Sequence, residues 1–280
     1  MSKKRATNGS THARESPAPP EAASARPDFS LVIPTYNEAQ GLRALLEAIQ
    51  AALGPAQIVY EVVLVDDNSP DGTAALAEQL AREFPVRVLR RSGKLGLSSA
   101  VIDGWKIAHG RVLGVMDADL SHDPRLLPSL YRSVDVGTAE VAVGSRYVAG
   151  GGMGNWPLWR QFISQVAVWM GSIISPVRDV TSGYLVLRHS VIEGVNLNPI
   201  GFKIGLELLV RGRYRTFTEI PYVFQDRAAG QSKLTLRVIR EYLVQLGQLV
   251  AFWIATRPQR QRVESLSAET THQTIKGAPV

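Results

Sequence analysis

The chain has 280 residues and a formal net charge of +6, with 45% hydrophobic and 20% charged residues, which suits one large globular domain or two small ones. It contains no cysteine, which excludes both a disulfide framework and a thiolate metal site. Residues 1–27 form a basic segment rich in Ser, Ala and Pro, and residues 258–280 are polar and unpatterned. We predict disordered tails in these two ranges and a folded domain at 28–257.

Apolar runs of strand type alternate with helical periods in the first half of the chain. Strands are expected at 29–34, 60–65, 86–90 and 111–116, and helices at 38–53, 73–83 and 97–109. We expect Thr73 to cap the second of these helices. Strands alternating with helices of 10 to 15 residues imply βαβ crossovers. The sequence therefore predicts an α/β fold with a Rossmann-like, mainly parallel sheet flanked by helices.

The second half is less regular, with strands expected at 140–145, 184–187 and 217–223. An apolar helix is expected at 159–174, and most Met and Trp residues of 153–170 are expected in the core. A helix at 237–254 closes the expected ordered region, and its apolar part, 242–255, contains Gln245 and Gln248. That part is shorter than the ~20 residues of a membrane span. We therefore predict an amphipathic helix that packs on the fold or lies on a membrane surface, and no transmembrane anchor.

The most informative feature is a pair of acids at the end of a strand. The apolar run 112–116 stops at Asp117 and Asp119. Open α/β sheets bind ligands at the carboxyl ends of their strands. Mg²⁺ or Mn²⁺ held by one or two carboxylates and by substrate phosphates is a common use of such a pair. A lone Asp-x-Asp often only opens a loop, so the surrounding motifs decide between the two interpretations.

Two further segments follow predicted strands. Residues 34–38, Pro-Thr-Tyr-Asn-Glu, form either a helix start or a contact for a nucleobase and ribose. Residues 66–73 place two acids in a turn-rich segment, where Asp, Asn and Ser also favour turns for local reasons. The cationic, glycine-containing segment 90–100 precedes a helix and could face an anion, although it is not a Walker A loop.

The order and spacing of these segments resemble glycosyltransferase family 2, most of all the polyprenyl (dolichyl) phosphate mannosyltransferases. The resemblance is carried by 34–38, 65–73, 116–122, 144–147, 181–183 and 227–234. It implies a GT-A nucleotide-sugar transferase fold. It also implies a glycine-rich acceptor loop at 148–155, which contains four glycines and is expected to be mobile.

The resemblance assigns roles to individual residues. The residues expected at the GDP nucleoside are Pro34, Tyr36, Glu38, Val65 and Asp67, and those at the diphosphate are Asp117, Ala118 and Asp119. The implied metal set is Asp117, Asp119 and Ser121, where Ser121 occupies a position at which some relatives carry a ligating glutamine. The cations expected around the donor and acceptor phosphates are Arg146, Arg160, Arg227 and Lys233. Asp119, Arg146 and Arg160 are the expected catalytic residues. His122 is expected to be structural or to support the metal ligands, rather than to act as a catalytic base.

The function that the resemblance implies is an inverting, Mg²⁺- or Mn²⁺-dependent transfer of mannose from GDP-mannose to a polyprenyl phosphate. A phosphate monoester is already anionic near pH 7, so no strong general base is needed. The enzyme is expected to be peripheral on the cytoplasmic face of a membrane. A separate membrane-anchoring subunit is a candidate partner, and nucleic acid is not. The alternatives are a transferase of the same family that uses UDP-glucose or another UDP-sugar, and a non-catalytic nucleotide-sugar binding protein.

Overall fold

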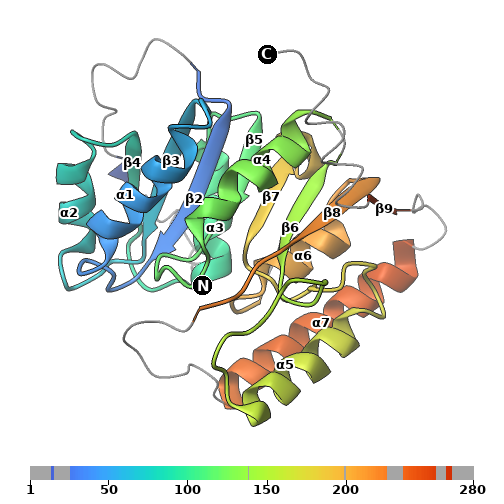
Figure 1. The fold of residues 1–280 in the computed structure, drawn as a ribbon. Helices are drawn as coiled ribbons and strands as arrows, with labels where there is room; N and C mark the ends of the chain where they lie inside the picture. Colours follow the sequence, from blue (N-terminus) through green and yellow to red (C-terminus); the bar gives the residue numbers. More distant parts are fainter. Residues whose placement is uncertain are drawn as a thin grey trace, which may run out of the picture.

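The computed structural model of the protein describes residues 26–137, 139–198, 200–225, 236–256 and 263–266, and the backbone of Arg14–Glu15. Within these residues one nine-stranded sheet has the order β1-β4-β3-β2-β5-β7-β6-β8-β9 (Figure 1). Its strands are β1 Arg14–Glu15, β2 Phe29–Thr35, β3 Tyr60–Asp66, β4 Val86–Arg90, β5 Val112–Val115, β6 Val141–Ser145, β7 Leu185–Arg188, β8 Thr216–Pro221 and β9 Glu264–Leu266.

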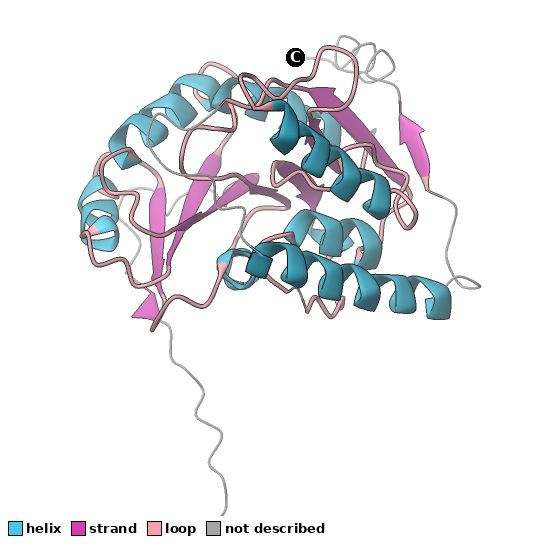
Figure 2. Ribbon diagram, turned by 90° about the horizontal axis from the view of Figure 1, so that it is seen from below, coloured by secondary structure: helices cyan, strands magenta, loops and turns pink. Residues whose placement is uncertain are grey.

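Helices cover both faces of this sheet, which lies between two helical layers in Figures 1 and 2. The α-helices are α1 Leu42–Leu53, α2 Thr73–Leu80, α3 Leu97–Ile107, α4 Leu127–Asp135, α5 Leu158–Gly171, α6 Ile204–Arg211 and α7 Leu236–Thr256, and the short 3₁₀ helices are η2 Pro124–Leu126 and η3 His189–Val191. Because side chains alternate along a strand, Leu31 and Ile33 of β2 join one hydrophobic core with α1, α2 and α4. Val32 joins the second core with α3, α6 and α7. The predicted fold class is confirmed.

Parallel pairing brings the predicted strand ends together. β4, β3, β2 and β5 are neighbours and run parallel, with Thr35 of β2 opposite Asp66 of β3. β7 runs antiparallel to both of its neighbours, β5 and β6. The carboxyl ends of β2, β3 and β5 therefore meet at one edge of the sheet, as the sequence predicts.

The start of α2 differs in detail from the prediction. Its N-cap is Gly72, whose φ of 85° places it in the left-handed region that favours glycine. Thr73 is the first helical residue, so the predicted cap is wrong. The Thr73 hydroxyl instead donates to Asp71 and accepts a hydrogen bond from the Glu38 backbone N–H. This contact ties the segment after β2 to the segment after β3.

Two short strands lie in segments predicted to be disordered. Arg14–Glu15 pairs with β4, and Glu264–Leu266 pairs with β8. The prediction is wrong for these residues, because the edges of the sheet offer unpaired backbone groups on which an unpatterned segment can add a strand. Most other residues of the two predicted tails lie outside the described residues.

The helix pair α5 and α7 corrects two further predictions. Trp156 is buried, but Trp159 and Trp169 are 54% and 67% exposed, so the core placement is wrong for both tryptophans. The two helices lie side by side (Figure 1), and the Tyr242 hydroxyl donates to the Ala167 carbonyl. The Arg237–Thr256 stretch is long and apolar enough to cross a membrane, judged by length and composition alone. Only 22% of its 18-residue apolar window is buried inside the protein. The expectation that this helix is too short is therefore wrong.

Candidate functional site

The acidic pair follows β5 in a strained turn. Asp117 is partly buried, and the Asp119 carboxylate accepts a hydrogen bond from the Ser121 N–H at 3.1 Å. Leu120, which lies between Asp119 and Ser121, has a φ of 59°, and this value is uncommon for a residue with a side chain. Such strain is found where the surrounding structure holds a functional turn.

The chemistry of this turn fits a divalent cation. None of the described residues donates a hydrogen bond to the Asp117 carboxylate, and the buried Ser121 hydroxyl has no partner among them. Carboxylate and hydroxyl oxygens are the hard ligands that Mg²⁺ and Mn²⁺ accept. No group of three His, Asp or Glu side chains suited to a metal occurs in the described part of the chain. A cation here would therefore complete its shell with water and substrate phosphate.

His122 is buried and holds this turn by a hydrogen bond. Its Nδ1 accepts a hydrogen bond from the Asp117 N–H at 3.1 Å, and its ring stacks on Tyr184 at 4.8 Å. Burial lowers the pKa of His122, and the nearby charges of Asp117 and Asp119 oppose this shift only in part. A neutral imidazole whose Nδ1 accepts a backbone hydrogen bond is an anchor for the turn. This geometry agrees with the predicted structural role.

The acids after β3 have a different environment. The Asp67 carboxylate accepts from Arg91 Nη1 at 2.6 Å and from the Gly96 N–H at 2.9 Å. Asp66 accepts from both the N–H and the hydroxyl of Ser69. Asp67 is predicted at the nucleoside, but its buried partner Arg91 is not predicted by the sequence pattern. Only the remaining lone pairs of Asp67 are available to a ligand.

The other predicted nucleoside residues lie at the same edge. Pro34, Tyr36 and Glu38 occupy the end of β2 and the turn after it, while the Val65 side chain is fully buried in β3. Val65 can therefore offer a ligand only its backbone. The Lys94 ammonium lies 3.7 Å from the centre of the Tyr36 ring, so one face of this ring is already covered by a cation.

Arg146 lies at the end of β6 in a buried ion pair that the sequence did not predict. Its Nε and Nη2 donate to the two carboxylate oxygens of Asp179, each at 2.7 Å, and Nη2 also donates to the Thr181 hydroxyl. Burial alone would raise the pKa of Asp179, but hydrogen bonds and charge from Arg146 lower it overall. Asp179 stands two residues before segment 181–183, one of those that carry the family resemblance, and this position was the available signal.

A tryptophan lies close to both predicted acceptor cations. The Arg160 guanidinium stacks 3.7 Å above the Trp156 ring, and the Arg146 guanidinium lies 5.8 Å from it. Arg146 and Arg160 are therefore brought together, as the resemblance implied. Arg227 and Lys233 lie outside the described residues.

Lys203 is a further cation that the sequence analysis missed. Its ammonium donates to the Thr181 carbonyl at 3.3 Å. Burial lowers the pKa of Lys203 to about 8. The charge of Arg146 also lowers this pKa, whereas the charges of Asp179 and Asp117 raise it. Arg146, Asp179 and Asp117 thus all lie near enough to Lys203 to affect its pKa.

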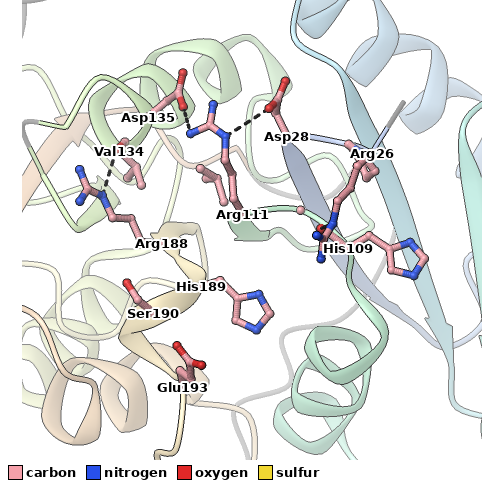
Figure 3. Close-up of a pocket in the computed structure, with 13 residues that line it drawn as sticks. Arg26, Asp28, His109, Arg111, Val134, Asp135, Arg188, His189, Ser190 and Glu193 are labelled. Atoms are coloured by element: carbon pink, nitrogen blue, oxygen red, sulfur yellow. Dashed lines mark hydrogen bonds and ion pairs between the residues drawn. The ribbon is translucent and has the colours of Figure 1, made fainter. Parts of the chain in front are cut away.

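A separate cavity of about 770 Å³ lies at the opposite end of the strands (Figure 3). Arg111 points between Asp28 and Asp135 and pairs with both, so its charge is already compensated. The cavity is lined by the start of β2 and β5 rather than by their carboxyl ends. It holds none of the predicted site residues, and we place the functional site at the other edge.

The sequence matches one family model and several proteins of known name. The family model described as glycosyl transferase family 2 matches residues 30–192. A dolichol-phosphate mannosyltransferase of Pyrococcus furiosus is 47% identical over 79% of this chain and 63% of its own length. The relative of the same name from Saccharomyces cerevisiae is 36% identical over 80% of this chain and 88% of its own length. The match thus spans less than two thirds of the archaeal relative.

Solved structures agree on the fold. A mannosyltransferase from Pyrobaculum calidifontis, in complex with GDP-Man and Mn²⁺, has a TM-score of 0.54 at 17% identity, covering 86% of this chain and 67% of its own. Glucosyl-3-phosphoglycerate synthase from Mycobacterium tuberculosis, with Mn²⁺ and UDP, has a TM-score of 0.56 at 16% identity, covering 84% and 81%. These likenesses confirm the predicted GT-A fold. With the sequence matches, they lead to one assignment: the chain belongs to glycosyl transferase family 2.

Proposed function

We propose that this protein transfers mannose from GDP-mannose to a polyprenyl monophosphate with inversion. The observation that carries the proposal is the acidic turn at Asp117 and Ser121, whose side-chain oxygens lack hydrogen-bond partners among the described residues, near Arg146 and Lys203. A diphosphate donor and a phosphate acceptor need both kinds of charge. The relatives from Pyrococcus furiosus and Saccharomyces cerevisiae, both named dolichol-phosphate mannosyltransferase, support this choice of donor and acceptor.

In the reaction an acceptor phosphate oxygen forms a bond to the sugar C1 as the bond from C1 to the GDP oxygen breaks. The acceptor is anionic before it binds, so the chain needs no base to remove a proton. The role of Arg146 is to hold phosphate oxygens at a fixed position, because a guanidinium offers a planar set of donors. Arg160, stacked on Trp156, has the same role toward the acceptor.

A bound Mg²⁺ or Mn²⁺ would neutralise the diphosphate charge that develops as GDP leaves. Asp117, Asp119 and Ser121 are the residues that would hold it. Arg227 and Lys233 are proposed as additional phosphate ligands from their positions in the sequence motif.

The acceptor is a lipid, and the exposed apolar surface of α5 and α7 supports contact with a membrane. Leu158, Phe162 and Trp169 are 82%, 68% and 67% exposed, although apolar side chains of this size usually pack against protein. The other exposed members of this surface are Trp159, Val166, Ile173, Ile239, Leu243, Val244 and Ile254. We propose peripheral binding to the cytoplasmic face, with the rings of Trp159 and Trp169 at the headgroup level.

A donor screen with purified protein tests the proposed reaction. With polyprenyl phosphate in anionic liposomes and Mn²⁺, GDP-mannose should give a lipid-linked sugar, whereas UDP-glucose should not. Turnover of UDP-glucose alone would select the rival transferase. Binding of GDP-mannose without transfer to any lipid phosphate would select the non-catalytic binding protein.

Flotation with the same liposomes tests the membrane surface. A variant carrying Phe162→Ser and Trp169→Ser should float less than the wild type, while its GDP affinity stays unchanged. A wild-type protein that remains soluble with these liposomes would mean that a separate anchoring subunit supplies the attachment.

A further inference from the structure

We infer that Asp179 is a positioning residue that holds the Arg146 guanidinium in the orientation needed to bind substrate phosphate. The inference rests on the proposed function and goes beyond it, because it assigns a role to an acid that touches neither substrate in the proposed reaction. The pair is buried on both sides, with 7% of the Arg146 side chain and none of the Asp179 side chain exposed.

The contacts fix one edge of the guanidinium. Asp179 accepts from Nε and Nη2 of Arg146 in a bidentate pair and also from the Arg146 backbone N–H at 3.0 Å. All these bonds leave Nη1 without a hydrogen bond to the described residues. A guanidinium held along one edge keeps its other donors available for a phosphate.

Asp179 is itself held on two sides. Its N–H donates to Glu219 Oε1 at 3.0 Å, and the Arg178 N–H donates to Glu219 Oε2 at 2.9 Å. The Thr181 hydroxyl bridges Asp179 and Arg146. Glu219 of β8 therefore fixes the backbone of Asp179, and the Thr181 hydroxyl holds its carboxylate against Arg146.

The charges nearby explain why such a hold is needed. The Phe224 ring lies 5.8 Å from both the Arg146 guanidinium and the His122 ring, and His122 accepts from the Asp117 N–H, so Arg146 lies near the acidic turn. A mobile guanidinium in this environment would be attracted to the acidic turn and would compete there with a cation. Stability alone is a weak reason for the pair, because a buried ion pair often stabilises no more than apolar residues of similar volume.

A double-mutant cycle with Asp179→Asn and Arg146→Ala tests the inference. Asn keeps the shape of Asp but not its charge, so the variant should fold with a lower melting temperature, because Arg146 loses its opposing charge. We expect Asp179→Asn to raise the KM for the lipid phosphate or to lower kcat on the order of 10- to 100-fold, the range for carboxylates that orient a functional group. In the Arg146→Ala background the same change should have almost no further effect.

Glu61→Gln provides the matched control. Glu61 forms another buried pair, with Arg87 at 3.1 Å, but at the amino end of the strands, where its carboxylate also accepts from the His109 N–H. Glu61→Gln should lower the melting temperature and leave KM and kcat unchanged. If Asp179→Asn behaves like Glu61→Gln, or if its kinetic effect multiplies with that of Arg146→Ala, Asp179 does not act through Arg146 and the inference is overturned.

Failure of the proposed function remains distinguishable. If the wild type transfers mannose to no lipid phosphate, the proposed reaction is wrong, and the cycle is measured by calorimetry with inorganic pyrophosphate and Mn²⁺. The positioning role would be supported if Asp179→Asn binds pyrophosphate more weakly than the wild type, and if the same change has no effect on binding in the Arg146→Ala background. Equal affinity of the wild type and Asp179→Asn would overturn it.

Discussion

Two strand ends carry adjacent or nearly adjacent acids, and the structure treats them differently. After β3, Asp66 and Asp67 accept hydrogen bonds from Ser69, Arg91 and Gly96. After β5, Asp117 accepts none from the described residues, and the nearby Ser121 hydroxyl is buried without a partner among them. The carboxylates at the first end already accept hydrogen bonds from the protein. The second has oxygens still available to a ligand.

The difference shows that an acidic strand end is not by itself a ligand site. At β3 Asp66 accepts from Ser69 and shapes the turn, while Asp67 pairs with the buried Arg91, so the charge of Asp67 is compensated inside the fold. At β5 the Asp117 carboxylate accepts no hydrogen bond from the described residues and the Ser121 hydroxyl has no partner among them, which makes the turn suited to a cation. Substitutions at the two ends should therefore separate stability from activity.

The largest effect is expected at the β5 end. Asp119→Ala should abolish transfer, since loss of a metal ligand costs several kcal/mol of transition-state stabilisation, or roughly 10³-fold or more in kcat. The circular dichroism spectrum should remain that of the wild type. Mn²⁺ should raise the melting temperature of the wild type but not of the variant. A folded Asp119→Ala protein with normal transfer would contradict the metal assignment.

The β3 end should respond in the opposite way. Asp67→Ala leaves the guanidinium of Arg91 buried without its main carboxylate, and breaking a buried pair from one side costs about 3–5 kcal/mol of unfolding free energy. Urea denaturation measures this loss. Asp117→Asn is the matched control and should cost less than about 1 kcal/mol, because its carboxylate accepts no hydrogen bond from the described residues. Equal losses for the two variants would remove the distinction between the strand ends.

The sequence predicted the parts of this comparison that depend on local pattern. Alternating strands and helices place the ends of β2, β3 and β5 at one edge, and the acids at 117 and 119 follow directly from the chain order. The partners of these residues were not predictable in the same way. Arg91 lies 24 residues from Asp67, and Asp179 lies 33 residues from Arg146, so each pairing depends on how strands and loops pack in three dimensions.

The exposed side of α5 shows a second limit. Its apolar period predicts a helix correctly, but the same period does not say whether protein or lipid covers the apolar side chains. Trp159 and Trp169 were assigned to the core on that basis and are exposed. Neither apolar content nor helical spacing carries the missing information, because a core and a membrane surface favour the same residues.

A smaller effect should follow from changing Ser121. Ser121→Ala removes a buried hydroxyl that has no partner among the described residues, so the unfolding free energy should change by less than about 1 kcal/mol. The affinity for Mn²⁺ should nevertheless fall roughly several-fold, because the ion loses one of its ligands. Ser121→Gln, which replaces the hydroxyl by a longer side chain with an amide oxygen, should bind Mn²⁺ more tightly. Calorimetric titration of the three proteins with Mn²⁺ would decide, and identical affinities would exclude Ser121 from the metal set.

The smallest effect concerns the His122 anchor, a feature of the β5 end alone. Burial lowers the pKa of His122 in the folded protein, while the unfolded chain keeps a value of about 6.5. The unfolded state therefore binds more protons below that pH, and folding stability falls as the pH drops from about 6.5 toward the lowered value. The slope cannot exceed one proton, or about 1.4 kcal/mol per pH unit. Urea denaturation at pH 7.5 and 5.5 should show this loss in the wild type, and His122→Asn should show less of it. Because every other titrating group is shared, an identical pH dependence in the two proteins would mean that His122 is protonated equally readily in the folded and unfolded states.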